Sequence, residues 1–175
     1  MEMRKTEKTY AASFFYPLML FLAVIMIALD QWTKILAVDH LKGQDPIVLI
    51  KNVLEIYYLE NHGAAFGMLQ NKQYFFWIIT VVFLVIALCF FRKVPKTGRF
   101  MPLSLSVVML VAGAIGNFID RITLQYVRDF IYFKLINFPV FNVADIYVTV
   151  GVILLVVLLL FVYKEEELNI FSIRK

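Results

Sequence analysis

Four long stretches without a charged side chain divide this sequence, and they constrain its fold more than any other feature. They cover residues 14–29, 73–91, 100–119 and 146–163. A helix needs about 17–25 apolar residues to cross a hydrocarbon core roughly 30 Å thick. The first stretch reaches that length when Asp30 and its neighbours lie at the interface. With 62% hydrophobic residues, against about 45–50% in soluble proteins, the chain is expected to be a membrane protein.

These stretches predict an all-α membrane protein that forms a single integral membrane domain over residues 1–175. Transmembrane helices are expected near residues 14–34, 73–91, 100–119 and 142–163, with outer segments at 35–72 and 120–141. β-Branched and aromatic residues partly alternate in IVLIKNVLEIYYLEN (47–61), which is typical of short strands. Because IYFKLINFPVF (131–141) has a similar composition, we expect a small extracytoplasmic β-rich cap.

The basic residues predict which way the helices run. RKVPKTGR (92–99), between the second and third stretches, has four basic residues and no acidic one. Residues 30–72 carry four basic and five acidic residues, and residues 120–145 carry three of each. Lysine and arginine mark cytoplasmic loops. We therefore expect the 92–99 loop and both termini in the cytoplasm, and the two longer connections outside.

Several other classes of function find little support in the sequence. The net charge of +4 is distributed as in a membrane protein, so no nucleic-acid partner is expected. Cys89 is the only cysteine, which excludes an internal disulfide, and we expect it to be a buried small apolar residue. His40 and His62 are isolated, so no metal site is expected. Ser104 and Ser106 lie within the third helix without a nearby base, which argues against serine chemistry.

Polar residues gather at one predicted depth. Asp145 lies eighteen residues before Tyr163, which is roughly 27 Å along a helix and close to the outer edge of the hydrocarbon. Asp30 ends the first outward helix, and Asn117 and Asp120 end the third. Ionisable groups at membrane depth are costly and tend to mark function. The outer interface is therefore the predicted place of a site.

Two of these groups also have ordinary interpretations. Asp30 and Lys34, spaced i, i+4, form either an interfacial ion pair or part of a site, and their spacing fits both. Asp120 is expected to be structural, because the neighbouring guanidinium of Arg121 favours the ionised carboxylate.

Asp129 and Asp145 remain as a candidate pair on the outer side. Two carboxyl groups that share one site do not both ionise easily. Such a pair can hold a water molecule, deprotonate it through one member and protonate a leaving amine through the other. Composition and spacing permit this pair.

Five motifs in order carry a resemblance to a known family. They are DQWTK (30–34), NHGAAFG (61–67), GNFIDR (116–121), VRDF (127–130) and FNVAD (141–145). They lie at the outer ends of the predicted helices, and the likeness covers nearly the full chain. The sequence resembles the lipoprotein signal peptidases (signal peptidase II), a family of bacterial membrane aspartyl proteases.

The resemblance implies roles for individual residues. Asp129 and Asp145 are implied to be the catalytic dyad, and Asn142 to orient either Asp145 or the scissile peptide. Further residues match positions that line, support or accompany the family's site: Asp30, Lys34, Asn61, Gly63, Phe66, Gly67, Asn117, Asp120 and Arg121. We expect Asn61, Arg121 and Asn142 to hold the substrate backbone through hydrogen bonds.

The resemblance also implies a substrate and a setting. The family cleaves diacylglyceryl-modified prolipoproteins just before the lipid-bearing cysteine, uses no metal or other cofactor, and is inhibited by globomycin, a cyclic peptide. A multi-pass enzyme of the bacterial cytoplasmic (inner) membrane is implied, in contact with membrane lipid, with its active site at the extracytoplasmic face. The β-rich outer segment is expected to act as a lid over bound substrate.

Arg128 departs from the pattern, because an apolar residue is more usual beside this aspartate. Successive side chains of an extended chain point to opposite sides. We therefore expect Arg128 to face solvent or lipid headgroups, away from Asp129.

Two other functions are compatible with polar residues in a membrane protein. A small four-helix transporter or channel would bind a proton or cation at Asp30 and Asp145, with these carboxylates near the middle of the bilayer. A non-catalytic assembly subunit would tolerate conservative aspartate-to-asparagine changes. The predicted depth of Asp145, at the outer edge, favours neither mid-bilayer transport nor a channel.

Overall fold

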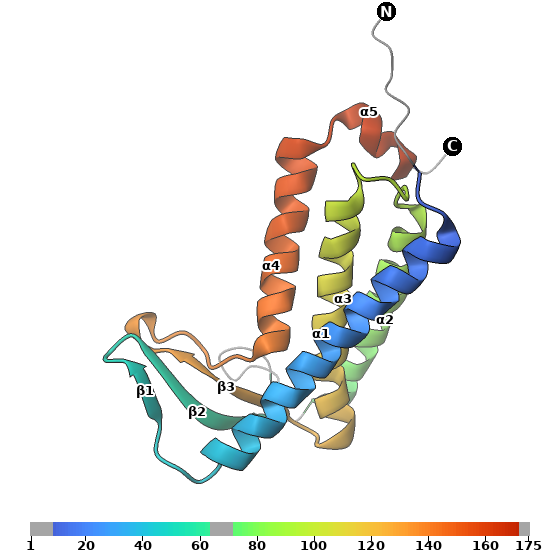
Figure 1. The fold of residues 1–175 in the computed structure, drawn as a ribbon. Helices are drawn as coiled ribbons and strands as arrows, with labels where there is room; N and C mark the ends of the chain where they lie inside the picture. Colours follow the sequence, from blue (N-terminus) through green and yellow to red (C-terminus); the bar gives the residue numbers. More distant parts are fainter. Residues whose placement is uncertain (1–8, 64–71, 172–175) are drawn as a thin grey trace, which may run out of the picture.

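Four long helices form the body of the protein in a computed structural model that describes residues 9–63 and 72–171 (Figure 1). They are α1 (Ala12–Leu41), α2 (Gln73–Lys93), α3 (Met101–Thr123) and α4 (Val143–Val157), which continues as a π-helical turn, Leu158–Val162. All four are long and apolar enough to cross a membrane. The predicted membrane protein with four transmembrane helices and a small β-rich cap is confirmed.

Helix α1 is longer than the sequence predicted. It ends at Leu41, seven residues after the expected end near residue 34. Thirty residues of helix measure roughly 45 Å, about 15 Å more than the hydrocarbon core. The helix runs obliquely across the others (Figure 1), and its last turns contact the β-sheet.

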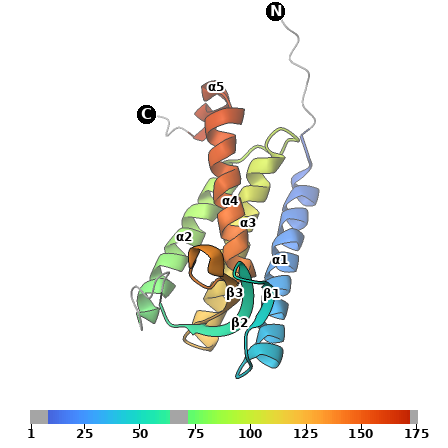
Figure 2. The same ribbon diagram turned by 90° about the vertical axis from the view of Figure 1, so that its left-hand side faces the viewer.

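Helix α3 is the centre of the bundle. It packs against α1, α2 and α4, while α1 and α2 lie on opposite sides of it (Figure 2). A Cβ added at Gly113 would lie 2.5 Å from the Ala144 carbonyl oxygen, and one at Gly116 would lie 2.5 Å from Asp30 Oδ2. These two glycines therefore let α4 and α1 approach α3 closely.

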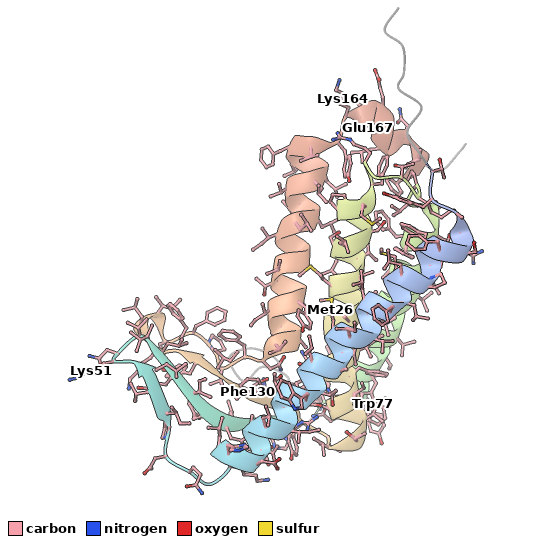
Figure 3. The ribbon with its side chains drawn as sticks, viewed as in Figure 1. Met26, Lys51, Trp77, Phe130, Lys164 and Glu167 are labelled. Atoms are coloured by element: carbon pink, nitrogen blue, oxygen red, sulfur yellow. The ribbon has the colours of Figure 1, made fainter. Side chains whose placement is uncertain are left out.

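A three-stranded antiparallel sheet lies at one end of the bundle, in the order β1-β2-β3 (Figure 1). Its strands are β1 (Ile47–Ile50), β2 (Leu54–Asn61) and β3 (Val127–Phe133). The strands expected within 47–61 are confirmed, whereas the extended part of 131–141 ends at Phe133 and a 3-10 turn, η2 (Lys134–Ile136), follows. The tip at Lys51 points away from the helices (Figure 3).

One small apolar cluster joins the sheet to α1. Phe130 of β3 packs with Ala37 and Leu41, and all three side chains are buried. Figure 3 shows Phe130 between the sheet and α1. Since Phe130 follows Asp129 directly, this contact holds the adjacent stretch of β3 against the bundle.

The C-terminal segment closes the opposite end of the bundle. A short helix, α5 (Glu165–Leu168), and a 3-10 turn, η4 (Asn169–Phe171), fold back there, with Lys164 and Glu167 far from the sheet (Figure 3). Arg99 donates to Glu167 Oε1 at 3.0 Å and to the Val162 carbonyl oxygen at 2.6 Å. The ring of Phe171 stacks on the ring of Phe90 of α2.

The expected burial of Cys89 is wrong. Its side chain is exposed on α2, among outward-facing apolar residues such as Ile86 and Leu88. Helix α2 is apolar around most of its circumference, so the sequence does not indicate which face turns towards the other helices.

Candidate active site

Asp129 lies on β3 and is almost fully buried, with 1% of its surface exposed. Both of its carboxylate oxygens accept hydrogen bonds from side-chain amides. The Asn61 Nδ2 donates to Oδ2 at 2.8 Å, and the Asn142 Nδ2 donates to Oδ1 at 2.6 Å. Strand pairing brings Asn61 to this place, because Asn61 of β2 lies opposite Val127, two residues before Asp129. The sheet register therefore sets one half of the environment of Asp129.

Asp145 is positioned by the beginning of α4. Asn142 is the N-cap of this helix, and its Oδ1 accepts from the Asp145 backbone N–H at 3.1 Å. In return, Asp145 Oδ2 accepts from the Asn142 backbone N–H at 3.1 Å. This reciprocal arrangement is a capping box, which satisfies two N–H groups that a helix start leaves without helical partners. The same bonds fix the Asp145 carboxylate relative to the helix.

Two asparagines connect the aspartates to each other and to α3. Asn142 is fully buried, and its Nδ2 donates both to Asp129 and to Asn117 Oδ1, the latter at 3.0 Å. Asn117 in turn donates from Nδ2 to Asp145 Oδ1 at 2.8 Å. Asp129 and Asp145 therefore belong to one hydrogen-bonded network, although they come from different elements.

A cluster of buried charges supports this network from behind. Lys34 Nζ lies 2.9 Å from Asp30 Oδ2 and 3.5 Å from Asp120 Oδ2, and it donates to Asn117 Oδ1 at 2.9 Å. These lysine and aspartate side chains are fully buried. Asp30 and Lys34 therefore do form an ion pair, but a fully buried one that is bonded to Asn117 of this network.

The expected position of Arg128 is wrong. Its guanidinium turns inwards, with 11% of the side chain exposed, and binds Asp120 through Nη2 at 2.6 Å and Nε at 3.1 Å. Its backbone N–H also donates to Asp120 Oδ2, at 3.0 Å. Arg128 does point to the side of β3 opposite Asp129, as alternation predicts. That side is covered by α1 and α3 and not by solvent.

The same contacts show that the expected partner of Asp120 is wrong. Arg128, and not the chain neighbour Arg121, pairs with this carboxylate. Side chains at adjacent helix positions do not face each other, and Arg121 instead turns towards a cavity, with its guanidinium carbon 4.6 Å from the centre of the Phe76 ring.

Gln31 also belongs to this buried polar network, and it was not predicted from the sequence. Its Nε2 donates to the Gly116 carbonyl oxygen at 3.0 Å and to Asp30 Oδ2 at 3.1 Å, and its Oε1 accepts from Arg128 at 2.8 Å. One sequence feature could have indicated this residue. Gln31 lies between Asp30 and Lys34, three residues before the lysine, and therefore on a neighbouring part of the same helix face.

A cavity of about 380 Å³ opens beside the two aspartates. Its polar lining consists of Asn61, Asn117, Arg121, Asp129, Asp145 and Thr149. Its apolar and small lining residues come from the sheet, from Gly63 just after β2, from the connection to α4 and from the first turns of α4: Gly63, Val127, Phe138, Pro139, Phe141, Ile146 and Val150. The cavity thus combines two carboxylates and a guanidinium with an apolar wall formed largely by α4 and the segment before it.

Burial is the main reason why the Asp129 carboxyl is a weaker acid than an ordinary aspartate. Burial, and after it the nearby charge of Asp145, raise the pKa of the Asp129 carboxyl from 3.8 to a net value of about 7. The amide donors of Asn61 and Asn142 and the charge of Lys34 oppose this change. A carboxyl with this pKa exchanges its proton near neutral pH, which suits a general acid or base.

The structure brings together most residues predicted for the site. Asp30, Lys34, Asn61, Asn117, Asp120, Asp129, Asn142 and Asp145 share one network, and Gly63 and Arg121 line the cavity beside it. Phe66 and Gly67 lie outside the described residues. Within residues 9–63 and 72–171, no group of three or more His, Cys, Asp or Glu side chains is arranged to hold a metal ion.

The sequence of this chain is similar to the sequences of known proteins. The model of the signal peptidase family described as "Signal peptidase (SPase) II" matches residues 22–161. The chain belongs to the lipoprotein signal peptidase family. A lipoprotein signal peptidase of Streptococcus thermophilus is 45% identical over 142 residues, covering 81% of this chain and 90% of that protein. One from Streptococcus pyogenes is 41% identical over 144 residues, covering 82% and 91%.

Solved structures agree with this membership. A bacterial membrane enzyme determined at 2.3 Å resolution superposes with a TM-score of 0.78 at 34% identity, covering 91% of this chain and 97% of the other. A second, at 1.9 Å resolution, gives a TM-score of 0.75 at the same identity. As a lipoprotein signal peptidase, the chain is a membrane protease of the aspartyl class that cleaves signal peptides from prolipoproteins. Mid-bilayer ion transport and a purely structural role are thereby set aside.

Proposed function

We propose that Asp129 and Asp145 are the catalytic dyad of this lipoprotein signal peptidase. The observation that carries the proposal is their shared environment: Asn142 binds both carboxylates, and both line the same cavity. Each carboxylate oxygen accepts one N–H donor within the network. Because a carboxylate oxygen has two lone-pair sites, each oxygen can also bind a water molecule or substrate atom.

In this mechanism the dyad holds one proton between its two carboxyl groups. The pKa of about 7 at Asp129 supports a shared proton near neutral pH. A water molecule attacks the scissile carbonyl carbon and gives its proton to the ionised carboxylate. When the resulting tetrahedral intermediate collapses, the carbon–nitrogen bond breaks and the protonated carboxyl donates its proton to the leaving amine. The dyad ends with one proton, as it began.

The supporting asparagines orient the dyad. All polar side-chain atoms of Asn142 are used in bonds to Asp129, Asp145 and Asn117, and its side chain is fully buried. These contacts support the role of orienting the dyad over that of binding the scissile peptide. Asn61 lines the cavity while it holds Asp129, so it can also contact the substrate backbone.

Arg121 is the proposed electrostatic partner of the reaction. It lines the cavity with both aspartates, and Phe76 supports the flat face of its guanidinium. A guanidinium in this place can donate hydrogen bonds to the substrate backbone and stabilise the negative oxygen of the tetrahedral intermediate. The apolar wall formed by Phe138, Ile146 and Val150 suits an apolar signal peptide entering from the lipid.

The proposed setting is the bacterial cytoplasmic (inner) membrane, with the dyad at its extracytoplasmic face. The basic connection at 92–99 lies between α2 and α3, at the end of the bundle opposite the sheet (Figure 1). The tendency of basic loops to remain cytoplasmic supports cytoplasmic termini and an outer sheet. The proposed substrate is a diacylglyceryl-modified prolipoprotein, cleaved just before the lipidated cysteine, and a globomycin-type cyclic peptide is the proposed inhibitor.

The test is cleavage by the purified protein in lipid vesicles, with a diacylglyceryl-modified prolipoprotein as the substrate. Asp129→Asn and Asp145→Asn are expected to lose turnover by at least about 10³-fold, while still unfolding cooperatively on heating as folded proteins. Asp45→Asn, an exposed aspartate of the outer segment, is the matched control and should cleave like wild type. Normal cleavage by either dyad variant would contradict the assignment. Globomycin should abolish cleavage by wild type and by the control.

A further inference from the structure

We propose that Arg128 is a positioning residue for the reaction, which clamps the strand carrying Asp129 to Asp120 and Gln31 in the helical bundle. The proposal rests on the assignment of Asp129 to the catalytic dyad. Arg128 itself lies on the opposite side of β3 from Asp129 and acts from behind the site.

The first support is the number of bonds between two residues. Asp120 accepts the Arg128 backbone N–H at 3.0 Å, its Nε at 3.1 Å and its Nη2 at 2.6 Å. A planar guanidinium bound at two points by a carboxylate has little freedom to rotate. The added backbone bond fixes the peptide between Val127 and Arg128, one residue before Asp129. The bonds from Asp120 in α3 therefore fix the backbone of β3 next to Asp129.

The second support is the contact with α1. The Arg128 Nη2 also donates to Gln31 Oε1 at 2.8 Å, while the Gln31 amide nitrogen binds the Gly116 carbonyl oxygen of α3. One side chain of β3 is thus attached to two helices. A lysine ammonium lacks the planar fork that makes these contacts together.

The third support is the balance of charge. Asp30, Lys34, Asp120 and Arg128 form a buried ion cluster with two negative and two positive groups. Unpaired buried charges are strongly unfavourable, so Asp120 needs both Lys34 and Arg128 if Asp30 is also ionised. Arg128 therefore completes a cluster whose other members come from the transmembrane helices.

The closest alternative is that Arg128 binds substrate. The cavity beside the dyad is lined by Arg121, whereas Arg128 is directed towards α1 and α3 and is mostly buried. Binding and positioning have different kinetic consequences. Loss of a substrate contact raises KM, while displacement of Asp129 lowers kcat with little effect on KM.

The experiment measures kcat and KM for prolipoprotein cleavage by Arg128→Gln, Arg128→Lys, Asp120→Asn and the double variant Arg128→Gln/Asp120→Asn in vesicles. Displacements of about 1 Å at a reacting group cost roughly 100-fold in rate. We expect kcat of Arg128→Gln to fall between about 10- and 100-fold, with KM within about twofold of wild type. Arg128→Lys should lie between wild type and Arg128→Gln. Because Arg128 acts through Asp120, the double variant should lose little more than the worse single variant.

Lys134→Gln is the matched control. Lys134 also pairs with a carboxylate of the sheet, Glu55, at 2.6 Å, but the lysine is half-exposed and follows the far end of β3. Its removal should leave kcat unchanged. If Arg128→Gln does not fold, as judged by thermal unfolding, Arg128→Lys carries the test, since it retains the positive charge of the buried cluster.

The outcomes separate this proposal from the catalytic assignment. If the dyad variants are inactive but Arg128→Gln retains wild-type kcat, the clamp is wrong and the dyad stands. A rise in KM alone, or multiplicative losses in the double variant, would also overturn the clamp. If Asp129→Asn cleaves normally, the proposed function itself fails, whatever the Arg128 variants do.

Discussion

Asn142 and Asp145 bind each other twice: the Asp145 N–H donates to Asn142 Oδ1, and the Asn142 N–H donates to Asp145 Oδ2, each at 3.1 Å. The start of α4 and the proposed catalytic carboxylate are therefore one structural unit. The remaining polar side-chain atom of Asn142, its Nδ2, extends this unit to Asp129 and Asn117.

Substitutions of Asn142 should separate its two roles. Asn142→Ser retains an oxygen that can cap the helix, but it loses the amide donor to Asp129. Asn142→Ala loses both, and the missing cap should cost about 0.5–2 kcal/mol of stability. We expect both variants to lose kcat by about 10²-fold or more, with only Asn142→Ala showing a lower thermal unfolding midpoint. Equal kcat for Asn142→Ser and wild type would show that the amide does not orient the dyad.

The stability of the protein should depend on pH through Asp129. Its pKa is about 7 in the folded protein and 3.8 as the ordinary value. The folded state binds more protons between these values, so this group's contribution to stability is present below about pH 4 and is lost as pH rises through about 7. Asp129→Asn removes the titration. It should unfold at a higher temperature than wild type at pH 8, and at a similar temperature near pH 4.

The control for this pH dependence is Asp45→Asn, which removes an exposed carboxyl of the outer segment. Its difference from wild type in unfolding temperature should stay constant over the same pH range. A constant difference for Asp129→Asn as well would contradict the raised pKa.

Gly116→Ala should separate α1 from α3. The new Cβ would lie 2.5 Å from Asp30 Oδ2 and 3.2 Å from the Ala144 Cβ. Overpacking of this kind costs about 1–3 kcal/mol, and here it also displaces a member of the buried ion cluster. We expect lower stability and lower kcat, measured by denaturant or thermal unfolding and by prolipoprotein cleavage. Gly98→Ala is the matched control, because its Cβ would meet only the Tyr10 hydroxyl at 3.7 Å.

Removal of Lys34 should be far more harmful than removal of an exposed lysine in a similar ion pair. Lys34→Gln leaves Asp30 and Asp120 with one fewer buried cation, and breaking a buried pair costs about 3–5 kcal/mol. Lys42 forms an ion pair of 2.8 Å with Glu60, but its side chain is 53% exposed, so Lys42→Gln should change the unfolding midpoint little. Similar midpoints for the two variants would contradict the charge cluster.

Much of the architecture follows from patterns that a sequence displays directly. Uncharged stretches of membrane-spanning length predict four helices, and the alternation around Glu55 predicts strands. The depth of Asp145 relative to Tyr163 indicates a polar site near one end of the bundle, where the structure has it. These predictions succeed because each depends on local composition or on distance along a single helix.

Other features depend on contacts between distant segments and could not be predicted. Alternation along a strand correctly turns Arg128 away from Asp129, but only the packing of α1 and α3 reveals that the opposite side is buried. Gln31 is connected to Gly116, 85 residues later, by a hydrogen bond, and nothing in its neighbourhood along the chain indicates this. The exposure of Cys89 could not be predicted, because α2 has no polar face that would indicate its orientation.

The site is assembled from α1, β2, α3, β3 and α4, and the last of these elements supplies Asp145 together with its cap. A chain entering the membrane from its N-terminus reaches α4 only after every other contributor has been inserted. Until then Asp129 lacks Asn142, and the cavity lacks its apolar wall. With the proposed dyad, proteolytic activity therefore requires the insertion of α4, the last of the four long helices.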